Sequence, residues 1–253
     1  MSDILLSARS INKCFGAVQA SKDFSLEIVR GELHALIGPN GAGKTTALSQ
    51  LSGELMPDSG RIDFDGRRIT RMAPHRRAQL GLARSYQITS VFDRLTVKEN
   101  LALAIQAHTG HSFRFWRKAA DDPAIQMSIE PALVRVGLEG RADLPAANLS
   151  HGEKRQLEVG MALAGRPKML LLDEPYAGMG PGGFVELTKL FRRLKAEVTI
   201  LLVEHDLRAV FALADRITLL VYGQAVACGT PEEIRRHPVA RQAYLGDEVN
   251  GCS

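Results

Sequence analysis

Short apolar runs lie at residues 32–37, 169–172, 198–203 and 217–222. Apolar side chains fill most positions of these runs instead of only every second one. This pattern is typical of parallel strands that are buried on both faces of a sheet. We therefore expect these four runs to form core strands.

Other stretches show alternating or helical patterns. Residues 4–31 predict two strands of a small sheet with a turn near Gly16, and residues 61–66 alternate like a further strand. From about residue 92 the spacing becomes helical, and Thr96 with Glu99 matches a capping box. We expect an inserted, mostly helical subdomain over approximately residues 88–165.

The segment GPNGAGKTT carries the strongest chemical signal. It fits the phosphate-loop pattern G-x-x-x-x-G-K-[ST] at every fixed position, and it lies between a strand and a helix that Gly53 would end. Inward-facing N–H groups and the helix N-terminus are expected to hold a polyphosphate. Lys44 would reach the β and γ phosphates, and the Thr45 hydroxyl would bind magnesium. A glycine-rich turn before an ordinary helix is the alternative, but it leaves the Lys-Thr pair unexplained. The loop consists of Gly38, Pro39, Asn40, Gly41, Ala42, Gly43, Lys44, Thr45 and Thr46.

Polar residues follow two other apolar runs. Asp173 and Glu174 end one strand, and His205 follows another. Two carboxylates are costly to bury unless they meet a cation or a reacting water, although an exposed acidic turn is the alternative. His205 taken alone could be a structural histidine. Because ligands collect at the carboxyl ends of parallel strands, we expect Gly38, Asp173 and His205 to line one edge of the sheet.

Composition narrows the class of protein. The 253 residues are 45% hydrophobic and 24% charged, as in a soluble globular protein with a full core. No apolar run approaches the ~20 residues of a membrane helix, and the start lacks a signal peptide pattern. Cys14, Cys228 and Cys252 have no metal-ligand spacing, which indicates free thiols in a reducing compartment. A net charge of +4 is too small to argue for nucleic acid. We expect a cytoplasmic chain that can dock on a membrane protein.

Two basic segments leave alternatives open. The first segment, at residues 67–84, is typical of a solvated helical face. It is also typical of a surface that contacts anionic lipid headgroups or an acidic loop of a partner. Its arginines are Arg67, Arg68, Arg71, Arg76, Arg77 and Arg84. The second lies around residues 110–123, where aromatic residues among basic ones can mark nucleic-acid stacking. Because no wider basic field surrounds it, we favour a subdomain surface or a subunit contact.

Taken in order, the motifs resemble the ATP-binding subunit of an ABC transporter over nearly the whole chain. They are GPNGAGKTT, Gln87 in SYQ, LSHGE at 149–153, LLLDEP at 170–175 and His205 in VEHD. Further segments are similar to the longer ATPase subunit of branched-chain amino acid importers. These are residues 85–100, 177–181, 229–234 and 243–246. The resemblance implies one α/β ABC ATPase domain over residues 1–253. Its phosphate-loop NTPase core would have a mostly parallel sheet, with a small antiparallel β subdomain and an inserted helical subdomain.

The resemblance also implies a role for individual residues. Phe15 would stack on adenine, Glu174 would be the general base, and His205 would contact the γ-phosphate and hold the attacking water in line. Magnesium would be arranged by Thr45, Gln87 and Asp173. The contacts to ATP bound by the opposite subunit would come from Ser150, Gly152 and Glu153.

The implied function is that of the ATP-hydrolysing motor of a membrane importer for branched-chain or related amino acids or similar small polar solutes. ATP and Mg²⁺ would be its cofactors. One phosphate loop and one LSHGE segment without an internal repeat imply head-to-tail pairing with a second ABC ATPase subunit, a paralogue or a copy. Permease subunits would hold the pair at the inner face of the cell membrane, a solute-binding protein would act indirectly, and no nucleic acid is expected. The alternatives are an exporter motor and, less favoured, a soluble ABC ATPase acting on nucleic acid or ribosomes.

The chain departs from the family pattern at three positions. Gly180 stands where many relatives have an aspartate that communicates across the dimer, so the resemblance does not carry that coupling over to this chain. His151 replaces a small residue, and Glu153 replaces the commoner glutamine. Glu153 is either turned away by its capping bond or has its charge offset by a partner.

Overall fold

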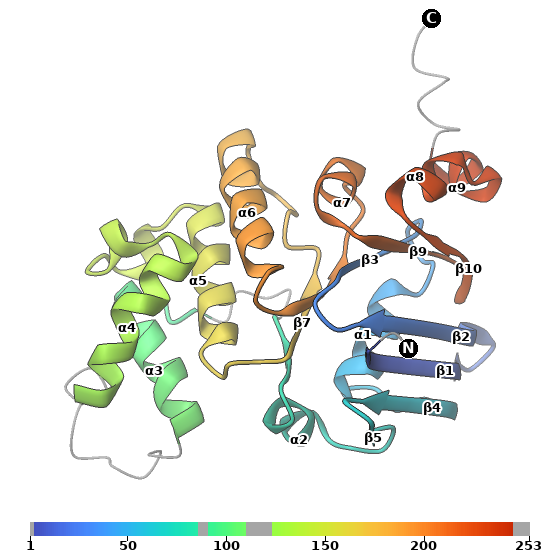
Figure 1. Cartoon of the computed structure of the whole chain (residues 1–253), viewed down its shortest axis with the longest axis horizontal. Helices are drawn as coiled ribbons and strands as arrows, with labels where there is room; N and C mark the ends of the chain where they lie inside the picture. Colours follow the sequence, from blue (N-terminus) through green and yellow to red (C-terminus); the bar gives the residue numbers. More distant parts are fainter. Residues whose placement is uncertain (1–2, 86–90, 110–122, 245–253) are drawn as a thin grey trace, which may run out of the picture.

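The computed structural model describes residues 3–85, 91–109 and 123–244. Two sheets lie beside each other, and most of the helices gather around the larger one (Figure 1). The larger sheet has the strand order β10-β9-β3-β8-β7-β6, and only β10 and β9 pair antiparallel. Its strands are β3 (Leu33–Ile37), β6 (Leu82–Arg84), β7 (Met169–Asp173), β8 (Thr199–Val203), β9 (Arg216–Val221) and β10 (Gln224–Gly229).

The apolar runs form the centre of this sheet, as the pattern predicts. Every residue of β3, β7 and β8 is buried. Because these three strands are parallel, their carboxyl ends meet at one edge. The segments that follow them therefore come together there.

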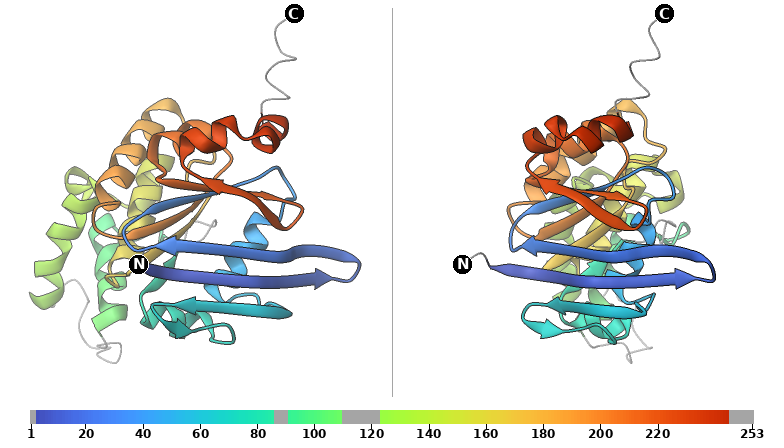
Figure 2. Two further views of the ribbon diagram at one scale, coloured as in Figure 1. Left: turned by 45° about the vertical axis from the view of Figure 1, so that its right-hand side comes forward. Right: turned by 90° about the vertical axis from the view of Figure 1, so that its right-hand side faces the viewer.

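The smaller sheet is antiparallel and has the order β2-β1-β4-β5. The turn after β1 contains Gly16 at φ 58°, a left-handed conformation that suits glycine. Figure 2 shows β1 and β2 as one long hairpin below the central sheet. The strands are β1 (Ile4–Phe15), β2 (Val18–Val29), β4 (Ser59–Phe64) and β5 (Arg67–Arg68).

The predicted helix starts are present. Ser150 forms a capping box with Glu153, and the Thr96 N–H donates to Glu99 at 2.8 Å. Among the described residues, 3₁₀ helices span Glu139–Arg141 and Ala146–Asn148. The α-helices are α1 (Lys44–Ser52), α2 (Pro74–Gln79), α3 (Val97–Thr109), α4 (Pro123–Val136), α5 (His151–Leu163), α6 (Pro181–Leu194), α7 (Leu207–Leu213), α8 (Pro231–Arg236) and α9 (Pro238–Tyr244).

Helices α3, α4 and α5 pack together at one end of the molecule (Figure 1). The assignment of residues 88–165 to an inserted subdomain stays a prediction. The aromatic and basic stretch at 110–122 lies outside the described residues. Within the described ranges, no helix combines the length and apolar character needed to cross a membrane.

Alternate residues of the central strands face different apolar clusters. In β7, Leu170 and Leu172 pack with α5 and α6. Met169 and Leu171 pack instead with α1 and the smaller sheet. Helix α1 is thus held between the two sheets, which fixes the direction of the loop that precedes it.

Arg77 does not belong to the solvated face that its basic segment predicts. Its side chain is 1% exposed, and burial lowers its pKa to about 10. The guanidinium donates to backbone carbonyl oxygens at 2.7–3.0 Å, and the acceptors are Gln50, Leu51, Thr70 and Met72. Arg77 therefore ties α2 to the last turn of α1, whereas its neighbour Arg76 is exposed as expected.

Candidate active site

The phosphate loop joins β3 to α1, and its glycines are required by close neighbours. A Cβ atom at Gly38 would lie 2.2 Å from the Leu220 carbonyl oxygen. Gly43 has φ 100°, and a Cβ there would lie 2.4 Å from the Ala20 carbonyl oxygen. Side chains at either position would push the loop away from β9 or β2.

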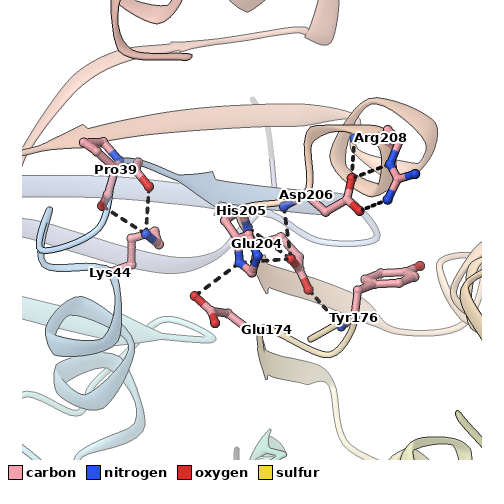
Figure 3. A network of polar contacts seen from close by, with 9 residues as sticks. Pro39, Lys44, Glu174, Tyr176, Glu204, His205, Asp206 and Arg208 are labelled. Carbon is pink, nitrogen blue, oxygen red and sulfur yellow. Dashed lines mark hydrogen bonds and ion pairs between the residues drawn. The ribbon is translucent and has the colours of Figure 1, made fainter. Parts of the chain in front are cut away.

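Lys44 lies inside the curve of the loop. Its ammonium donates to the carbonyl oxygens of Gly38 at 2.7 Å and Pro39 at 3.1 Å (Figure 3). Burial lowers its pKa, and the negative charges of Glu174, Asp173 and Glu204 oppose this shift. The cation is thus fixed where the loop, β7 and β8 meet.

Asp173 ends β7 and is almost completely buried. Its Oδ2 accepts a hydrogen bond from Arg84 at 3.0 Å. Its Oδ1 is buried and has no hydrogen-bond partner among the described residues. Burial raises its pKa, and Arg84 opposes the shift.

The unpaired Oδ1 of Asp173 fits a magnesium ligand. Mg²⁺ is commonly held by one or two carboxylates together with hydroxyl, water and phosphate oxygens. Thr45, at the start of α1, supplies an exposed hydroxyl. The third expected ligand, Gln87, lies outside the described residues. Among the described residues, no group of three or more His, Cys, Asp or Glu side chains is placed to hold a metal ion.

Glu174 and His205 face each other at the carboxyl ends of β7 and β8 (Figure 3). His205 Nδ1 lies 3.7 Å from Glu174 Oε1, and the two side chains are 55% and 24% exposed. Glu174 has φ 44°, a left-handed conformation that is uncommon for residues other than glycine. This turn directly follows β7 and places the partly exposed carboxylate beside His205.

The first turn of α5 brings Ser150, Gly152 and Glu153 together. A Cβ at Gly152 would lie 3.1 Å from Gly183 Cα, so α5 and α6 start in close contact. His151 Nε2 lies 3.1 Å from the Ala177 carbonyl oxygen. In Figure 1 this helix and α1 lie on opposite sides of β7, so the two motifs are not brought together within one chain.

Two further observations complete the site. Phe15 is 51% exposed at the end of β1, and the Lys13 ammonium lies 5.6 Å from its ring centre. Its contact with a base stays a prediction.

The sequence motifs did not point to Glu204 or Arg84. Glu204 accepts a hydrogen bond from Tyr176, in the loop after β7, and Arg84 donates one to Asp173. An acidic residue at the end of an apolar strand was the available signal for Glu204.

Comparison with known proteins places this geometry in a family. A family model described as "ABC transporter" matches residues 21–177, more than half of the chain. The chain belongs to the ABC transporter family. A second model, described as "Branched-chain amino acid ATP-binding cassette transporter", matches residues 226–250 of this ABC protein.

Individual relatives agree with the assignment. The ABC chain is 37% identical over 254 residues to the high-affinity branched-chain amino acid transport ATP-binding protein LivG of Salmonella typhimurium, covering 98% of this chain and 100% of LivG. It is 34% identical to the lipopolysaccharide export system ATP-binding protein LptB of Acidithiobacillus ferridurans, covering 96% and 98%. A crystal structure of the ADP conformation of an ABC transporter cassette superposes with a TM-score of 0.85 at 30% identity, covering 96% and 99%. The predicted α/β ATPase fold and the family are therefore confirmed, and the chain is an ATP-binding ABC ATPase.

Proposed function

We propose that this ABC ATPase is the motor subunit of a membrane importer for branched-chain or related amino acids, or similar small polar solutes. The observation that carries the proposal is the convergence of the phosphate loop, Asp173, Glu174 and His205 at one sheet edge. The branched-chain transporter model at residues 226–250 supports the solute class. LivG, by its name, serves that class in its own organism.

The chain's own residues suit phosphoryl transfer, which depends mainly on positioning and on stabilising charge. The loop amides and Lys44 would hold the β and γ phosphates. Thr45 and Asp173, with Gln87, would hold Mg²⁺, which when bound neutralises phosphate charge. Glu174 would orient the attacking water and take its proton, and His205 would contact the γ-phosphate beside it.

A complete site would need a second subunit. The start of α5 lies on the far side of β7 from the chain's own phosphate loop. In a head-to-tail pair, Ser150, Gly152 and Glu153 would contact ATP held by the other chain. That chain would be a copy or a paralogue, and permease subunits would anchor the pair at the inner face of the membrane, with a solute-binding protein acting on the permease.

Glu174→Gln tests the assigned base. The amide cannot accept the proton, so we expect hydrolysis of Mg-ATP to fall by at least about 100-fold while nucleotide affinity changes little. Phosphate release and binding of a fluorescent ATP analogue by the purified chain measure the two quantities. Glu186→Gln is the control, because Glu186 is exposed on α6 and pairs only with Lys189 among the described residues. Hydrolysis of ATP at the wild-type rate by Glu174→Gln would show that Glu174 is not the general base.

The direction of transport needs the whole complex, since the similarity to LptB keeps an exporter as the second candidate. Affinity purification from native membranes would supply the permease partners for reconstitution in vesicles with the ATPase outside. We expect ATP-dependent loss of a radiolabelled branched-chain amino acid from the solute-binding side and its appearance on the ATPase side. ATP-driven movement of lipid out of the membrane, with no amino acid transport, would support the exporter instead.

A further inference from the structure

Glu204 is the last buried residue before His205, and its carboxylate connects two loops. The residue is 0% exposed. Its Oε1 accepts the N–H of Tyr176 at 2.9 Å. Its Oε2 accepts the N–H groups of His205 at 3.0 Å and Asp206 at 3.3 Å (Figure 3).

No lysine or arginine pairs with this carboxylate in the described part of the chain. The closest side-chain nitrogen that can carry a positive charge in the described residues is His205 Nδ1, at 3.9 Å from Oε2. Burial raises the pKa of Glu204, and the three backbone N–H groups oppose the shift. A buried carboxylate is costly unless it is paired or hydrogen-bonded, and here three backbone N–H groups supply the hydrogen bonds.

The two loops that Glu204 joins carry the reacting groups. Tyr176 follows Glu174 by two residues, and the Glu174 N–H itself donates to the Val203 carbonyl oxygen at 2.9 Å. The backbone after β7 is therefore attached to the end of β8 at two points. One of these points is the hydrogen bond from the Tyr176 N–H to Glu204 Oε1. The other oxygen of the same carboxylate, Oε2, accepts the N–H of His205.

We propose that Glu204 is a positioning residue that sets the distance and direction between Glu174 and His205. This inference rests on the proposed function, in which those two residues act on the same γ-phosphate and water. A carboxylate suits the task because both of its oxygens accept hydrogen bonds and neither donates one. Misplacement of a reacting group by about 1 Å can lower a rate about 100-fold.

Glu204→Gln is the first test. The amide has nearly the same shape, but its NH₂ must face the N–H of Tyr176 or those of His205 and Asp206, so one loop is released. We expect kcat for ATP hydrolysis by the purified chain to fall about 10- to 100-fold. Affinity for the ATP analogue should stay within about threefold, because Lys44 and its loop are unchanged. A kcat within twofold of wild type would overturn the proposal.

The matched control is Glu32→Gln. Glu32 also accepts a backbone N–H, from Val29 at 3.0 Å, and lies 3.0 Å from a neighbouring histidine, His34. It precedes β3, at the opposite end of the sheet from the reacting groups. We expect this variant to change thermal stability without the selective loss of kcat. An equal loss of kcat in both variants would overturn the positioning role.

A double-mutant cycle separates this inference from the proposed function. If Glu204 acts through Glu174, Glu204→Gln should lower the residual rate of Glu174→Gln by less than it lowers the wild-type rate. Additive losses would overturn the proposal while leaving Glu174 as the base. A wild-type rate in Glu174→Gln would instead refute the proposed function.

If Glu204→Gln does not fold, Glu204→Asp replaces it as the test. Aspartate keeps both acceptor oxygens but shortens their reach. An unchanged kcat with normal nucleotide binding in this variant would overturn the inference.

Discussion

At the scale of single residues, Glu153 has both carboxylate oxygens engaged. Oε2 accepts the Ser150 N–H at 2.8 Å, and Oε1 pairs with Arg141 at 2.7 Å. Burial raises the pKa of Glu153, but the bonds from Ser150 and Arg141 outweigh it and hold the pKa below its usual value. Both explanations that the sequence left open therefore apply. The group caps its helix, and its charge is offset.

Glu153→Gln separates these two roles. The glutamine oxygen can still cap α5, while the negative charge disappears and Arg141 loses its carboxylate partner. We expect ATP-driven dimerisation, measured by sedimentation in the Glu174→Gln background, to tighten roughly 2- to 5-fold. Glu139→Gln, which removes an exposed charge nearby, should leave dimerisation unchanged. An unaltered dimer affinity in Glu153→Gln would mean that the side chain serves only as the cap.

Motif spacing pointed to Lys44 and Glu174, which lie close together in the structure, but it did not point to Arg84 or Glu204. A motif specifies residues that are close in sequence. The contact of Arg84 with Asp173 spans 89 positions and arises only because β6 pairs with β7. Such partners become visible once the strand order is known.

At the scale of elements, the anchoring of α2 by Arg77 can be tested against its neighbour. Arg77→Met keeps much of the apolar volume but leaves buried carbonyl oxygens of α1 and of residues 70–72 without donors. We expect the free energy of unfolding to fall by about 2–4 kcal/mol, measured with urea. Arg76→Met alters an exposed side chain of the same helix and should cause no measurable change. Equal effects from the two substitutions would contradict the anchoring role.

The pattern predicted long or fully buried elements better than short ones. Strands β3, β7 and β8 are continuous apolar runs, whereas β6 has only three residues and β10 has mostly exposed or half-buried ones. Helix α2 has six residues and is positioned by the Arg77 guanidinium. Elements of this kind depend on tertiary contacts, so local pattern carries little information about them.

At the scale of the whole molecule, the shared edge of the parallel strands followed from the sequence, but the strand order did not. Strand β3 pairs with β8 on one side and with β9 on the other. Strands β6 and β7 follow β3 more closely in the chain than β8 and β9 do, but neither of them pairs with it. Similar apolar runs can pair in several orders, and the crossover connections decide among them. The start of α5 lies across β7 from the phosphate loop (Figure 1), a separation that fits the expected pairing of two chains.

That separation leads to a complementation experiment between two inactive chains. Lys44→Ala loses the phosphate loop's cation but keeps the LSHGE segment. Ser150→Asp keeps a helix cap, since aspartate is a good N-cap, but directs a negative charge at the partner's phosphate. In a head-to-tail mixed dimer, one site combines the intact phosphate loop of the Ser150→Asp chain with the intact LSHGE segment of the Lys44→Ala chain. Equal mixing should therefore recover about one quarter of the wild-type ATPase rate, since half of the dimers are mixed and one of their two sites is whole.

The control for complementation is a mixture of Lys44→Ala with Asp173→Asn. Both defects then lie on the phosphate-loop side, so no mixed dimer contains a complete site and no recovery is expected. Each variant alone, at the same total concentration, gives the baseline. Recovery in the control mixture as well would show that the restored activity does not come from combining one chain's loop with the other chain's LSHGE segment. Absence of recovery in both mixtures would contradict head-to-tail pairing, provided that sedimentation shows mixed dimers. The LSHGE segment at the start of α5 would then have to pair with a partner other than a second copy of this chain.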